Sequence, residues 1–421
     1  MDWTFAKIPT TELTHGIIEY PAALHPHIAK ELIRMYGKEG GLMLDPFVGS
    51  GTTLVEARLG KMRGIGFDIN PLAIMISKVK SLAFKDYDFS MLKQKITSDF
   101  ESKKRLPSFK RAAALLNLST AEANSWYPKK TCRELSLLIS AINKLESDAE
   151  KYVCYIAVGE LLRKLSYQRP KETKKYRKKG WRNFKQNQGY TPVFPHFTER
   201  LDLILDSLKK FEQCIPESNF LPIVHLFNSS TNSEFPSDAI KIDLVVTSPP
   251  YGDSKTTVAY EQFTWFANNG LGLDKRPDGA LGREMLGGTI PKELPEKFGH
   301  RTTDRTLELM PSEIRKKNKA FLFEYLESIN NVAAMMNKGG IVCYVVGNRS
   351  WKGAGNKRLR LDLFTKWAFE KNGFKLIGKI IERNVIKKKQ PIRSSNDGVA
   401  DGAGEVSESM NFEYIVRLRK L

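Results

Sequence analysis

The stretch GGLMLDPFVGSGTTLVEARLGKMRGIGFD, residues 40–68, contains two short apolar segments separated by a glycine-rich turn and a helical pattern. The first apolar segment, up to Asp45, and the second, residues 62–68, have the composition of buried strands in a parallel sheet. A further helical pattern, NPLAIMISKVKSLAF, follows at residues 70–84. Short apolar strands that alternate with helices predict an α/β fold with a doubly wound sheet.

The turn after the first strand has the features of a ligand site. Gly49 and Gly51 would let the backbone approach a ligand closely, and the following helix offers free amide donors at its N-terminus. Asp68 stands 23 residues after Asp45, near the roughly 20-residue spacing at which an acidic side chain meets ribose hydroxyls in dinucleotide folds. Leu54 replaces the third glycine of the dinucleotide fingerprint. The pattern therefore favours a cofactor with a ribose but no tightly held pyrophosphate, and S-adenosylmethionine meets that description.

Asp45 would then lie near the cationic methionine end of the cofactor, where a carboxylate attracts both the ammonium and the sulfonium. An aspartate at this position is also compatible with a helix cap or a turn, and this alternative stays open.

The charge of the whole chain indicates an anionic partner. The 421 residues carry a formal net charge of +20, which favours nucleic acid before membrane. No apolar run approaches the roughly 18 residues of a transmembrane helix, and the N-terminus does not resemble a signal peptide, so we expect a cytoplasmic protein. The four cysteines are far apart and predict reduced thiols and no metal site.

The pattern changes between residues 85 and 215, where amphipathic helices precede the segment RPKETKKYRKKGWRNFK at 169–185. We expect a mostly helical insertion that carries an exposed basic loop and divides the sheet domain. Residues 1–84 would form its cofactor-binding half and residues 216–421 its catalytic half, the latter with a polar insertion at about 268–318.

The catalytic half contains the strand pattern KIDLVVTSPPY, residues 241–251. Two prolines directly after a strand end its ladder and hold the backbone in an extended form. The corner presents a hydroxyl and an aromatic ring, which suits a flat ligand, although an ordinary loop at the end of a strand is the alternative. GIVCYVVGNRS at 340–350 predicts a further strand, and residues 374–386 and 411–420 predict a closing strand pair.

Three motifs together, DPFVGSGTTLVEA, GIGFDINPLA and TSPPY, resemble the amino-group DNA methyltransferases. YPAALHPHI, at residues 20–28, is similar to the motif with which these enzymes close over the methionine end of the cofactor. TSPPY resembles the N4-cytosine branch more than the adenine branch, whose motif usually begins with Asp. The later VVGNRSWKG and NFEYIV are similar to methylases of the same branch. The order of the motifs is that of the alpha group, and the resemblance covers roughly residues 14–80, 220–270 and 340–420.

The resemblance implies a Rossmann-like S-adenosylmethionine-dependent sheet with an antiparallel closing strand. Asn228 follows the third strand, where the family usually has an acidic residue, and would bond the adenine amino group. The cofactor-binding residues it implies are Tyr20, Pro21, Ala22, Asp45, Pro46, Phe47, Gly49, Ser50, Gly51, Thr52, Thr53, Asp68, Ile69, Asn70, Asn228 and Thr247.

The Ser-Pro-Pro-Tyr corner suits methylation of an exocyclic amine, whose lone pair is delocalised into the base. Acceptors from the Ser248 hydroxyl and the Pro249 carbonyl would draw the nitrogen towards a tetrahedral shape, with Pro250 stiffening the corner. Tyr251 would stack on the flipped base. Methylation at cytosine C5 is disfavoured because it needs a cysteine nucleophile, normally after proline, and no cysteine here follows a proline.

Double-stranded DNA is the expected partner, held through the basic segment and read by residues 165–200 or 275–318. A solvated surface loop is the alternative for the basic segment. Rival functions are an N6-adenine methyltransferase, an RNA methyltransferase and a non-catalytic DNA-binding protein on the same fold. A cognate restriction endonuclease is expected from the resemblance alone. The candidate DNA-binding residues are Arg169, Lys174, Lys175, Arg177, Lys178, Lys179, Trp181 and Arg182.

Overall fold

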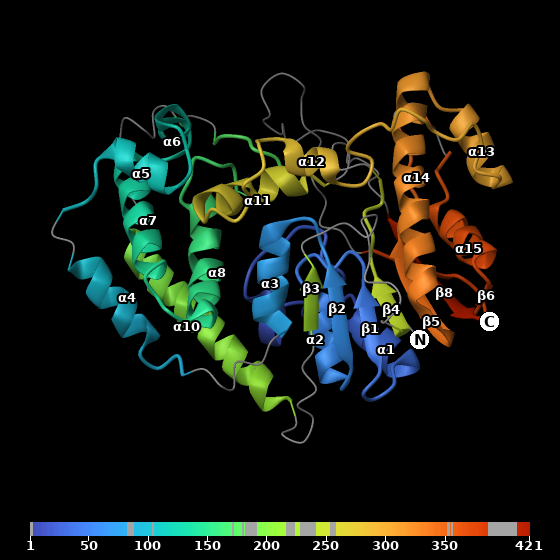
Figure 1. Cartoon of the computed structure of the whole chain (residues 1–421), viewed down its shortest axis with the longest axis horizontal. Helices are drawn as coiled ribbons and strands as arrows, with labels where there is room; N and C mark the ends of the chain where they lie inside the picture. Colours follow the sequence, from blue (N-terminus) through green and yellow to red (C-terminus); the bar gives the residue numbers. More distant parts are fainter. Residues whose placement is uncertain are drawn as a thin grey trace.

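The computed structural model shows an open α/β sheet with a helical body beside it (Figure 1). It describes residues 3–81, 88–102, 105–170, 172–178, 181, 192–215, 224–227, 241–252, 258–351, 354, 357–385 and 411–421, with residues 224–227 described by their backbone alone.

The sheet of the described residues has eight strands in the order β3-β2-β1-β4-β5-β8-β6, and β7 also pairs with β8. β1 to β5 are parallel, whereas β8 runs antiparallel to β5, β6 and β7. This confirms the predicted doubly wound sheet with an antiparallel closing strand. The strands are β1 (Leu42–Asp45), β2 (Arg63–Phe67), β3 (Val224–Phe227), β4 (Ile242–Thr247), β5 (Met336–Val346), β6 (Phe374–Leu376), β7 (Ile381–Asn384) and β8 (Phe412–Lys420).

Apolar side chains cover both faces of the sheet, because neighbouring residues of a strand point to opposite sides. Leu44 and Val342 belong to the core under α14 and α15, while Met43 and Cys343 belong to the core under α1 and α2. Layers on both faces explain why the strands read as continuous apolar runs. The covering helices are α1 (Pro26–Tyr36), α2 (Thr52–Leu59), α14 (Ser312–Met335) and α15 (Leu361–Lys371).

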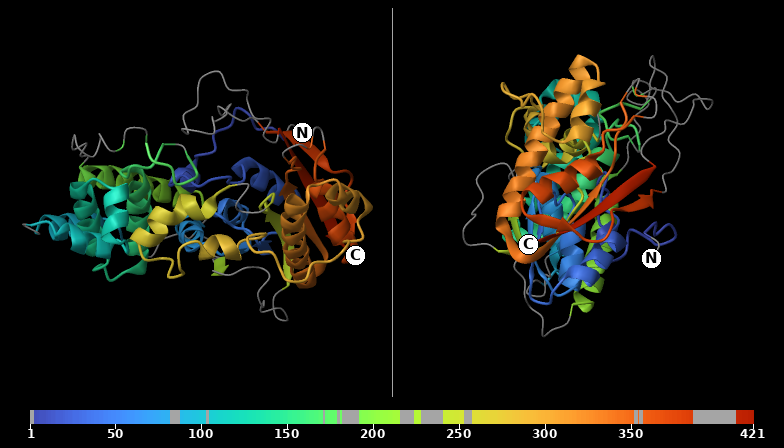
Figure 2. Two further views of the ribbon diagram at one scale, coloured as in Figure 1. Left: turned by 90° about the horizontal axis from the view of Figure 1, so that it is seen from above. Right: turned by 90° about the vertical axis from the view of Figure 1, so that its right-hand side faces the viewer.

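A third core joins the sheet to the helical body. Leu72 and Ile76 of α3 (Pro71–Ser81) pack in one cluster with Val153 and Ile156 of the central helix α8. Figure 2 shows this body at one end of the molecule and α14 and α15 at the other. The helices of the body are α4 (Leu92–Glu101), α5 (Phe109–Leu115), α6 (Thr120–Trp126), α7 (Lys129–Ile142), α8 (Asp148–Lys164) and α10 (Val193–Gln213).

The segment between β4 and α14 crosses the carboxyl ends of the strands and joins the helical body. It contains α11 (Tyr260–Gly270), α12 (Ala280–Glu284) and α13 (Arg301–Glu308). Trp265 and Phe266 of α11 are buried in the core of the helical body. A short 3-10 helix, η1 (Leu13–Gly16), precedes α1. None of the described helices is long and apolar enough to span a bilayer.

Candidate active site

A pocket lies at the carboxyl ends of β1, β2 and β4, the edge at which open parallel sheets bind ligands. Its walls come from six separate stretches of the sequence. The lining residues are Tyr20, Pro21, Ala22, Ala23, Leu24, Asp45, Pro46, Phe47, Val48, Gly49, Ser50, Thr52, Thr53, Phe67, Asp68, Ile69, Ser248, Pro250, Tyr260, Glu284, Met285 and Leu286.

The carboxylate of Asp45 joins three elements at the floor of this pocket. Its Oδ1 accepts from the Thr247 hydroxyl at 2.6 Å and from the Phe47 amide at 3.0 Å, and its Oδ2 accepts from the Thr53 hydroxyl at 2.5 Å. Burial outweighs these hydrogen bonds and raises the pKa of Asp45 to about 6. Asp45 therefore fixes the end of β1 against β4 and α2 while it provides a carboxylate in an apolar environment.

Asp68 and Gly49 form the second polar corner of the pocket. Asp68 Oδ2 accepts from the Gly49 amide at 3.0 Å, and its Oδ1 accepts from the Asn70 amide at 2.8 Å. Burial raises the pKa of Asp68 to about 6. Gly49 has a φ of +49°, in the left-handed region that glycine tolerates best, so the backbone can turn its amide towards Asp68.

Gly51 contributes to packing and does not line the pocket. It caps α2 with a φ of +81°, and a Cβ at this position would lie 2.8 Å from the Cα of Ser77 on α3. Thr247 also lies outside the lining, since its hydroxyl is bonded to Asp45 below the surface of the pocket.

Two tyrosines form one wall. The rings of Tyr20 and Tyr260 are stacked with their centroids 6.1 Å apart. Burial, followed by the charge of Asp68, raises the pKa of both phenols, so they remain neutral. Tyr20 comes from the segment that precedes α1 and Tyr260 opens α11, so the wall joins the N-terminal segment to the segment between β4 and α14.

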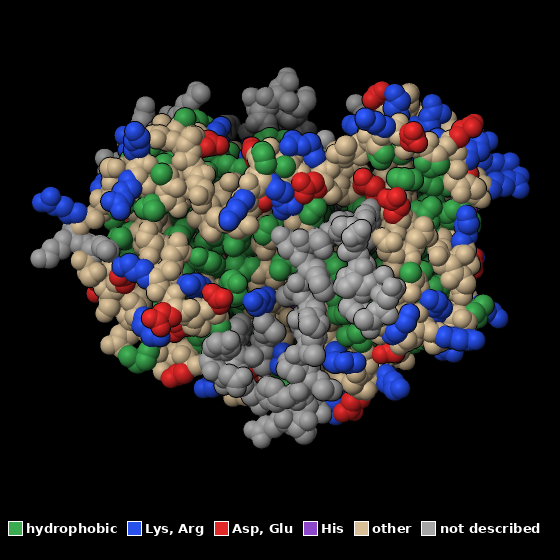
Figure 3. All heavy atoms as spheres, viewed as in Figure 1, with side chains coloured by type: hydrophobic (Ala, Val, Ile, Leu, Met, Phe, Trp, Pro, Cys, Tyr) green, Lys and Arg blue, Asp and Glu red, His purple; other side chains and the backbone are tan. Residues whose placement is uncertain are grey.

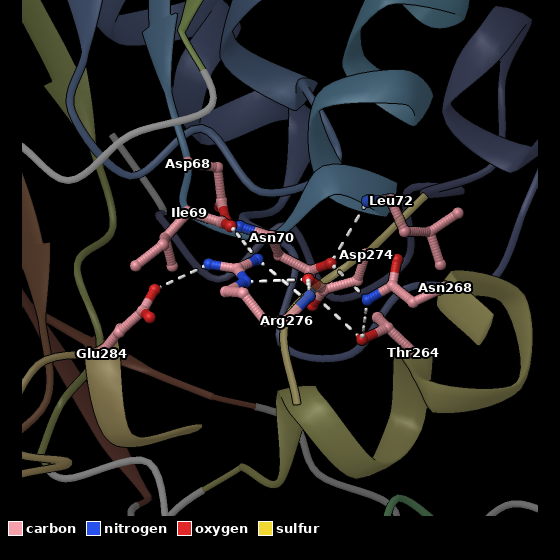
Figure 4. A network of polar contacts seen from close by, with 9 residues as sticks. All are labelled: Asp68, Ile69, Asn70, Leu72, Thr264, Asn268, Asp274, Arg276 and Glu284. Carbon is pink, nitrogen blue, oxygen red and sulfur yellow. Dashed lines mark hydrogen bonds and ion pairs between the residues drawn. The ribbon is translucent and has the colours of Figure 1, made fainter. Parts of the chain in front are cut away.

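Asn70 does not line the pocket, although the sequence placed it among the cofactor-binding residues, but its Nδ2 donates to the hydroxyl of the wall residue Tyr20 at 3.5 Å. Its Nδ2 donates to the Thr264 hydroxyl at 3.1 Å, and its Oδ1 accepts from Asn268 Nδ2 at 3.1 Å (Figure 4). Asn70 is fully buried, so its amide connects α3 to α11.

Arg276 secures the polar insertion over the second strand, as Figure 4 also shows. Its Nη2 donates to the Ile69 carbonyl at 3.0 Å, and its Nη1 pairs with Glu284 Oε2 at 2.8 Å. The Nε of Arg276 donates to Asp274 Oδ1 at 2.8 Å. These bonds bring Glu284, Met285 and Leu286 into the wall beside Ile69.

The Ser-Pro-Pro-Tyr corner lies at the end of β4, with Ser248 and Pro250 in the pocket wall and Pro249 buried behind them. The hydroxyls of Ser248 and Tyr251 are 3.0 Å apart. The Tyr251 hydroxyl also donates to Glu413 Oε1 on β8 at 3.0 Å. The corner is therefore fixed to the closing strand of the sheet.

The described cations of the basic segment are half-buried, which differs from the exposed loop that the sequence predicted. The guanidinium of Arg177 lies 4.5 Å from the centroid of Trp126 and 5.0 Å from that of Trp181, and its Nε donates to the Ser125 carbonyl. The ammonium of Lys175 lies 4.1 Å from the centroid of Trp265. Cation–π contacts of this kind hold the segment against the helical body.

The other described cations of the basic segment are half-buried as well. Lys178 Nζ donates to the Ser166 carbonyl at 3.2 Å, while Arg169 and Lys174 are half-buried. Lys179, Arg182 and the candidate adenine contact Asn228 lie outside the described residues.

A second cationic surface lies over α13 and the beginning of α14, where Figure 3 shows Lys and Arg side chains gathered. The run RKKNK, residues 315–319, forms part of it. Its exposed members are Lys297, Arg301, Arg305, Lys316 and Lys317.

Sequence reasoning missed the pocket residues between β4 and α14 and the contact with Glu413. Tyr260, Glu284, Met285 and Leu286 carry no motif, and only the folded chain brings them to the end of β2. The motif NFEYIV contained Glu413 and offered a signal, but nothing in the sequence paired it with Tyr251.

Comparison with known proteins agrees with this geometry. A family model described as a DNA methylase, covering N6 and N4 methyltransferases, matches residues 2–79. The Type II methyltransferase M.MvaI of Kocuria varians is 30% identical over 375 residues, which cover 83% of this chain and 80% of that protein. The chain belongs to the amino-group DNA methyltransferases.

Other similarities of this amino-group DNA methyltransferase are weaker. The Type II methyltransferase M.BsoBI of Geobacillus stearothermophilus is 26% identical over 260 residues, covering 56% of this chain and 49% of that protein. The solved structure of TrmN from Thermus thermophilus has a TM-score of 0.32 at 10% identity and covers 95% of this chain and 50% of that one, which is too low to carry an argument.

The methyltransferase family and its fold imply S-adenosylmethionine as the methyl donor and DNA as the substrate. The chemistry of the pocket is compatible with this donor. Asp45 and Asp68 are carboxylates whose charge is costly in an apolar environment, and a cationic ligand or a ribose hydroxyl offsets that cost.

Proposed function

We propose that this amino-group DNA methyltransferase methylates the exocyclic N4 of a cytosine that is flipped out of double-stranded DNA. The observation that carries the proposal is that Ser248 lines the same pocket as Asp45 and Asp68, so that an acceptor for the target amine lies beside the candidate donor site. The choice of cytosine rests on the serine that opens the Ser-Pro-Pro-Tyr motif.

We propose that the pocket holds the cofactor through residues at its two polar corners. Asp68 would accept from the ribose hydroxyls, with Ile69 packing beside the adenine. Asp45 would act on the methionine end chiefly through the charge of its carboxylate, whose two oxygens already accept three hydrogen bonds. When bound, S-adenosylmethionine supplies an electrophilic methyl group.

The adenine end of the cofactor would meet a carboxylate from an unexpected segment. Glu284 lines the pocket beside Ile69, and Arg276 holds only its Oε2 in the described structure. Its second oxygen would accept from the adenine amino group, the role that an acidic residue after the third strand usually has in this family.

At the other end, the Ser248 hydroxyl oxygen and the Pro249 carbonyl would accept the two hydrogens of the target amine. Rigid acceptors that are already in place lower the barrier because they need no rearrangement during the reaction. The nitrogen would bond to the methyl carbon with its lone pair while the methyl–sulfur bond breaks and its electrons stay on the sulfur of the departing S-adenosylhomocysteine. The alkylated nitrogen would then be acidic and lose a proton. No strong base is required for that last step.

DNA would be held by the basic segment on one side of the pocket and by the cationic surface over α13 and α14 on the other. Lys175 and Arg177 are stacked on indole rings, so they would present a fixed charge to the phosphates. Arg301, Arg305, Lys316 and Lys317 would contribute from α13 and α14. A cognate restriction endonuclease is part of the proposal as a functional partner only.

Identification of the methylated nucleoside tests the proposal. Unmethylated bacterial DNA is incubated with the protein and with S-adenosylmethionine labelled in its methyl group, and then digested to nucleosides. Mass and retention time are compared with standards of N4- and 5-methyldeoxycytidine and N6-methyldeoxyadenosine. We expect labelled N4-methyldeoxycytidine. Labelled N6-methyldeoxyadenosine would refute the choice of base, and DNA without label would refute methylation of DNA and direct the assay to RNA.

A further inference from the structure

The hydroxyl of Tyr251 lies between two oxygen atoms. Ser248 Oγ is 3.0 Å away within the same corner, and Glu413 Oε1 is 3.0 Å away on β8. A phenol has a single proton, so it can donate to one of these oxygens only.

Chemistry fixes which atom donates in each of the two hydrogen bonds that join Ser248, Tyr251 and Glu413. A carboxylate has no proton and only accepts, so the Tyr251 hydroxyl donates to Glu413. Burial, and then the charge of Glu413, raises the pKa of Tyr251 well above its ordinary value, which keeps the phenol protonated. The Ser248 hydroxyl must then donate to the Tyr251 oxygen. Both lone pairs of Ser248 Oγ remain for other hydrogens.

Glu413 is itself held in place from the opposite side. Arg383 Nη1 on β7 lies 2.6 Å from Glu413 Oε2, and the two side chains are only 5% and 18% exposed. Arg383 Nε donates to the Trp3 carbonyl at 2.9 Å, which ties the pair to the N-terminal segment. A paired and largely buried carboxylate keeps its position better than one on the surface.

We infer that Glu413 is a positioning residue that acts through Tyr251 to make Ser248 an acceptor for the target amine. The inference rests on the proposed function, because it requires Ser248 to bind that amine. If the Tyr251 proton turned to Ser248 instead, one lone pair of Ser248 would be used and the acceptor would be weakened.

The substitution Glu413→Gln would reverse the direction of both hydrogen bonds of the Tyr251 hydroxyl with little change in side-chain shape. A glutamine has one carbonyl oxygen, and the positive charge of Arg383 favours this oxygen on its own side. The amide NH2 then faces Tyr251 and donates to it, so the Tyr251 proton must turn towards Ser248.

The test measures the single-turnover rate of methyl transfer, cofactor affinity and DNA affinity for Glu413→Gln, Tyr251→Phe and the double variant. We expect each single variant to lose about 10-fold to 100-fold in rate with both affinities retained. The double variant should be no slower than either single variant, because both changes act on one hydrogen bond. Glu382→Gln on β7 is the matched control, since Glu382 is exposed, and it should keep the wild-type rate.

A wild-type rate for Glu413→Gln, or rate losses that multiply in the double variant, would overturn the inference. If Glu413→Gln does not fold, Tyr251→Phe decides the question, because it leaves the Glu413–Arg383 pair in place. An undiminished rate for Tyr251→Phe would then overturn it. Ser248→Ala distinguishes a failure of this inference from a failure of the proposed function, since full activity of that variant would refute the proposed function itself.

Discussion

The hydroxyl of Thr247 donates to Asp45 Oδ1 over 2.6 Å, joining two residues that are 202 positions apart. Asp45 ends β1 at the glycine-rich turn, and Thr247 ends β4 just before the Ser-Pro-Pro-Tyr corner. One buried hydrogen bond therefore connects the two motifs, so that a change at either residue is expected to disturb both.

Asp45→Ala should abolish cofactor binding and lower the free energy of unfolding by about 1–3 kcal/mol, because the Phe47 amide and the Thr53 and Thr247 hydroxyls lose their acceptor. Isothermal titration with S-adenosylmethionine and denaturant unfolding measure the two effects. Asp243→Ala is the control, since Asp243 bonds β1 at the other end of the same strand pair. The Asp243→Ala variant should be less stable but bind S-adenosylmethionine with unchanged affinity. Equal losses of cofactor affinity in both variants would exclude a direct role for Asp45.

The titration of Asp45 predicts a pH dependence of stability. Its pKa is about 6 in the folded protein and near its ordinary value of 3.8 in the unfolded chain. Because the folded protein binds the Asp45 proton more tightly than the unfolded chain does, protonation of Asp45 stabilises the fold fully below pH 3.8. This contribution is lost as the pH rises through 6. The free energy of unfolding of the wild type minus that of Asp45→Asn should fall by on the order of 2–3 kcal/mol over this window. Parallel pH profiles of the two proteins would count against a titrating Asp45.

Gly51→Ala should destabilise the protein more than Gly339→Ala does. Both glycines have a φ near +80°, but a Cβ on Gly51 would lie 2.8 Å from the Cα of Ser77, whereas nothing lies within 4 Å of a Cβ on Gly339. The strain of the left-handed backbone is common to both, so the difference, about 1–3 kcal/mol, reports the clash between α2 and α3. Thermal and denaturant unfolding measure it, and equal losses would show that α2 can shift freely.

Glu284→Gln should weaken the binding of S-adenosylhomocysteine by about 10-fold, since an amide that donates where the cofactor needs an acceptor loses a charge-assisted hydrogen bond. Glu308→Gln provides the control, because Glu308 is an exposed carboxylate on α13 that lies outside the pocket lining. Unchanged affinity of Glu284→Gln would remove Glu284 from the adenine end of the site.

Much of the fold could be predicted because the strands are short, apolar and separated by helices, as in β1, α2 and β2. The closing strand pair was only partly right. The segment expected as one strand, residues 374–386, forms the two short strands β6 and β7, and Gly378 between them has a φ of +62°, which breaks the extended backbone.

The candidate site could be predicted where it follows a strand end and not where it depends on tertiary contacts. Residues after β1, β2 and β4 meet because parallel strands end at one edge of the sheet. Glu284 reaches the pocket because Arg276 binds both Glu284 and the Ile69 carbonyl. The amide of Asn70 is instead taken up by neighbouring side chains, among them Thr264 and Asn268. Neither arrangement leaves a periodic pattern in the sequence.

The basic segment shows a similar limit. Alternating aromatic and basic residues are compatible both with a solvated loop and with cations stacked on indoles. Only the positions of Trp126 and Trp265 on α6 and α11 decide between the two for Arg177 and Lys175.

The most direct test of the account measures cofactor affinity and methyl transfer on the same preparation of Ser248→Ala. Ser248 lines the pocket with Asp45 and Asp68, but its proposed role concerns the target amine alone. We predict an affinity for S-adenosylmethionine within about 2-fold of wild type and a single-turnover rate that is at least about 100-fold lower. Transfer near the wild-type rate would contradict the account, because the target amine would then be activated elsewhere.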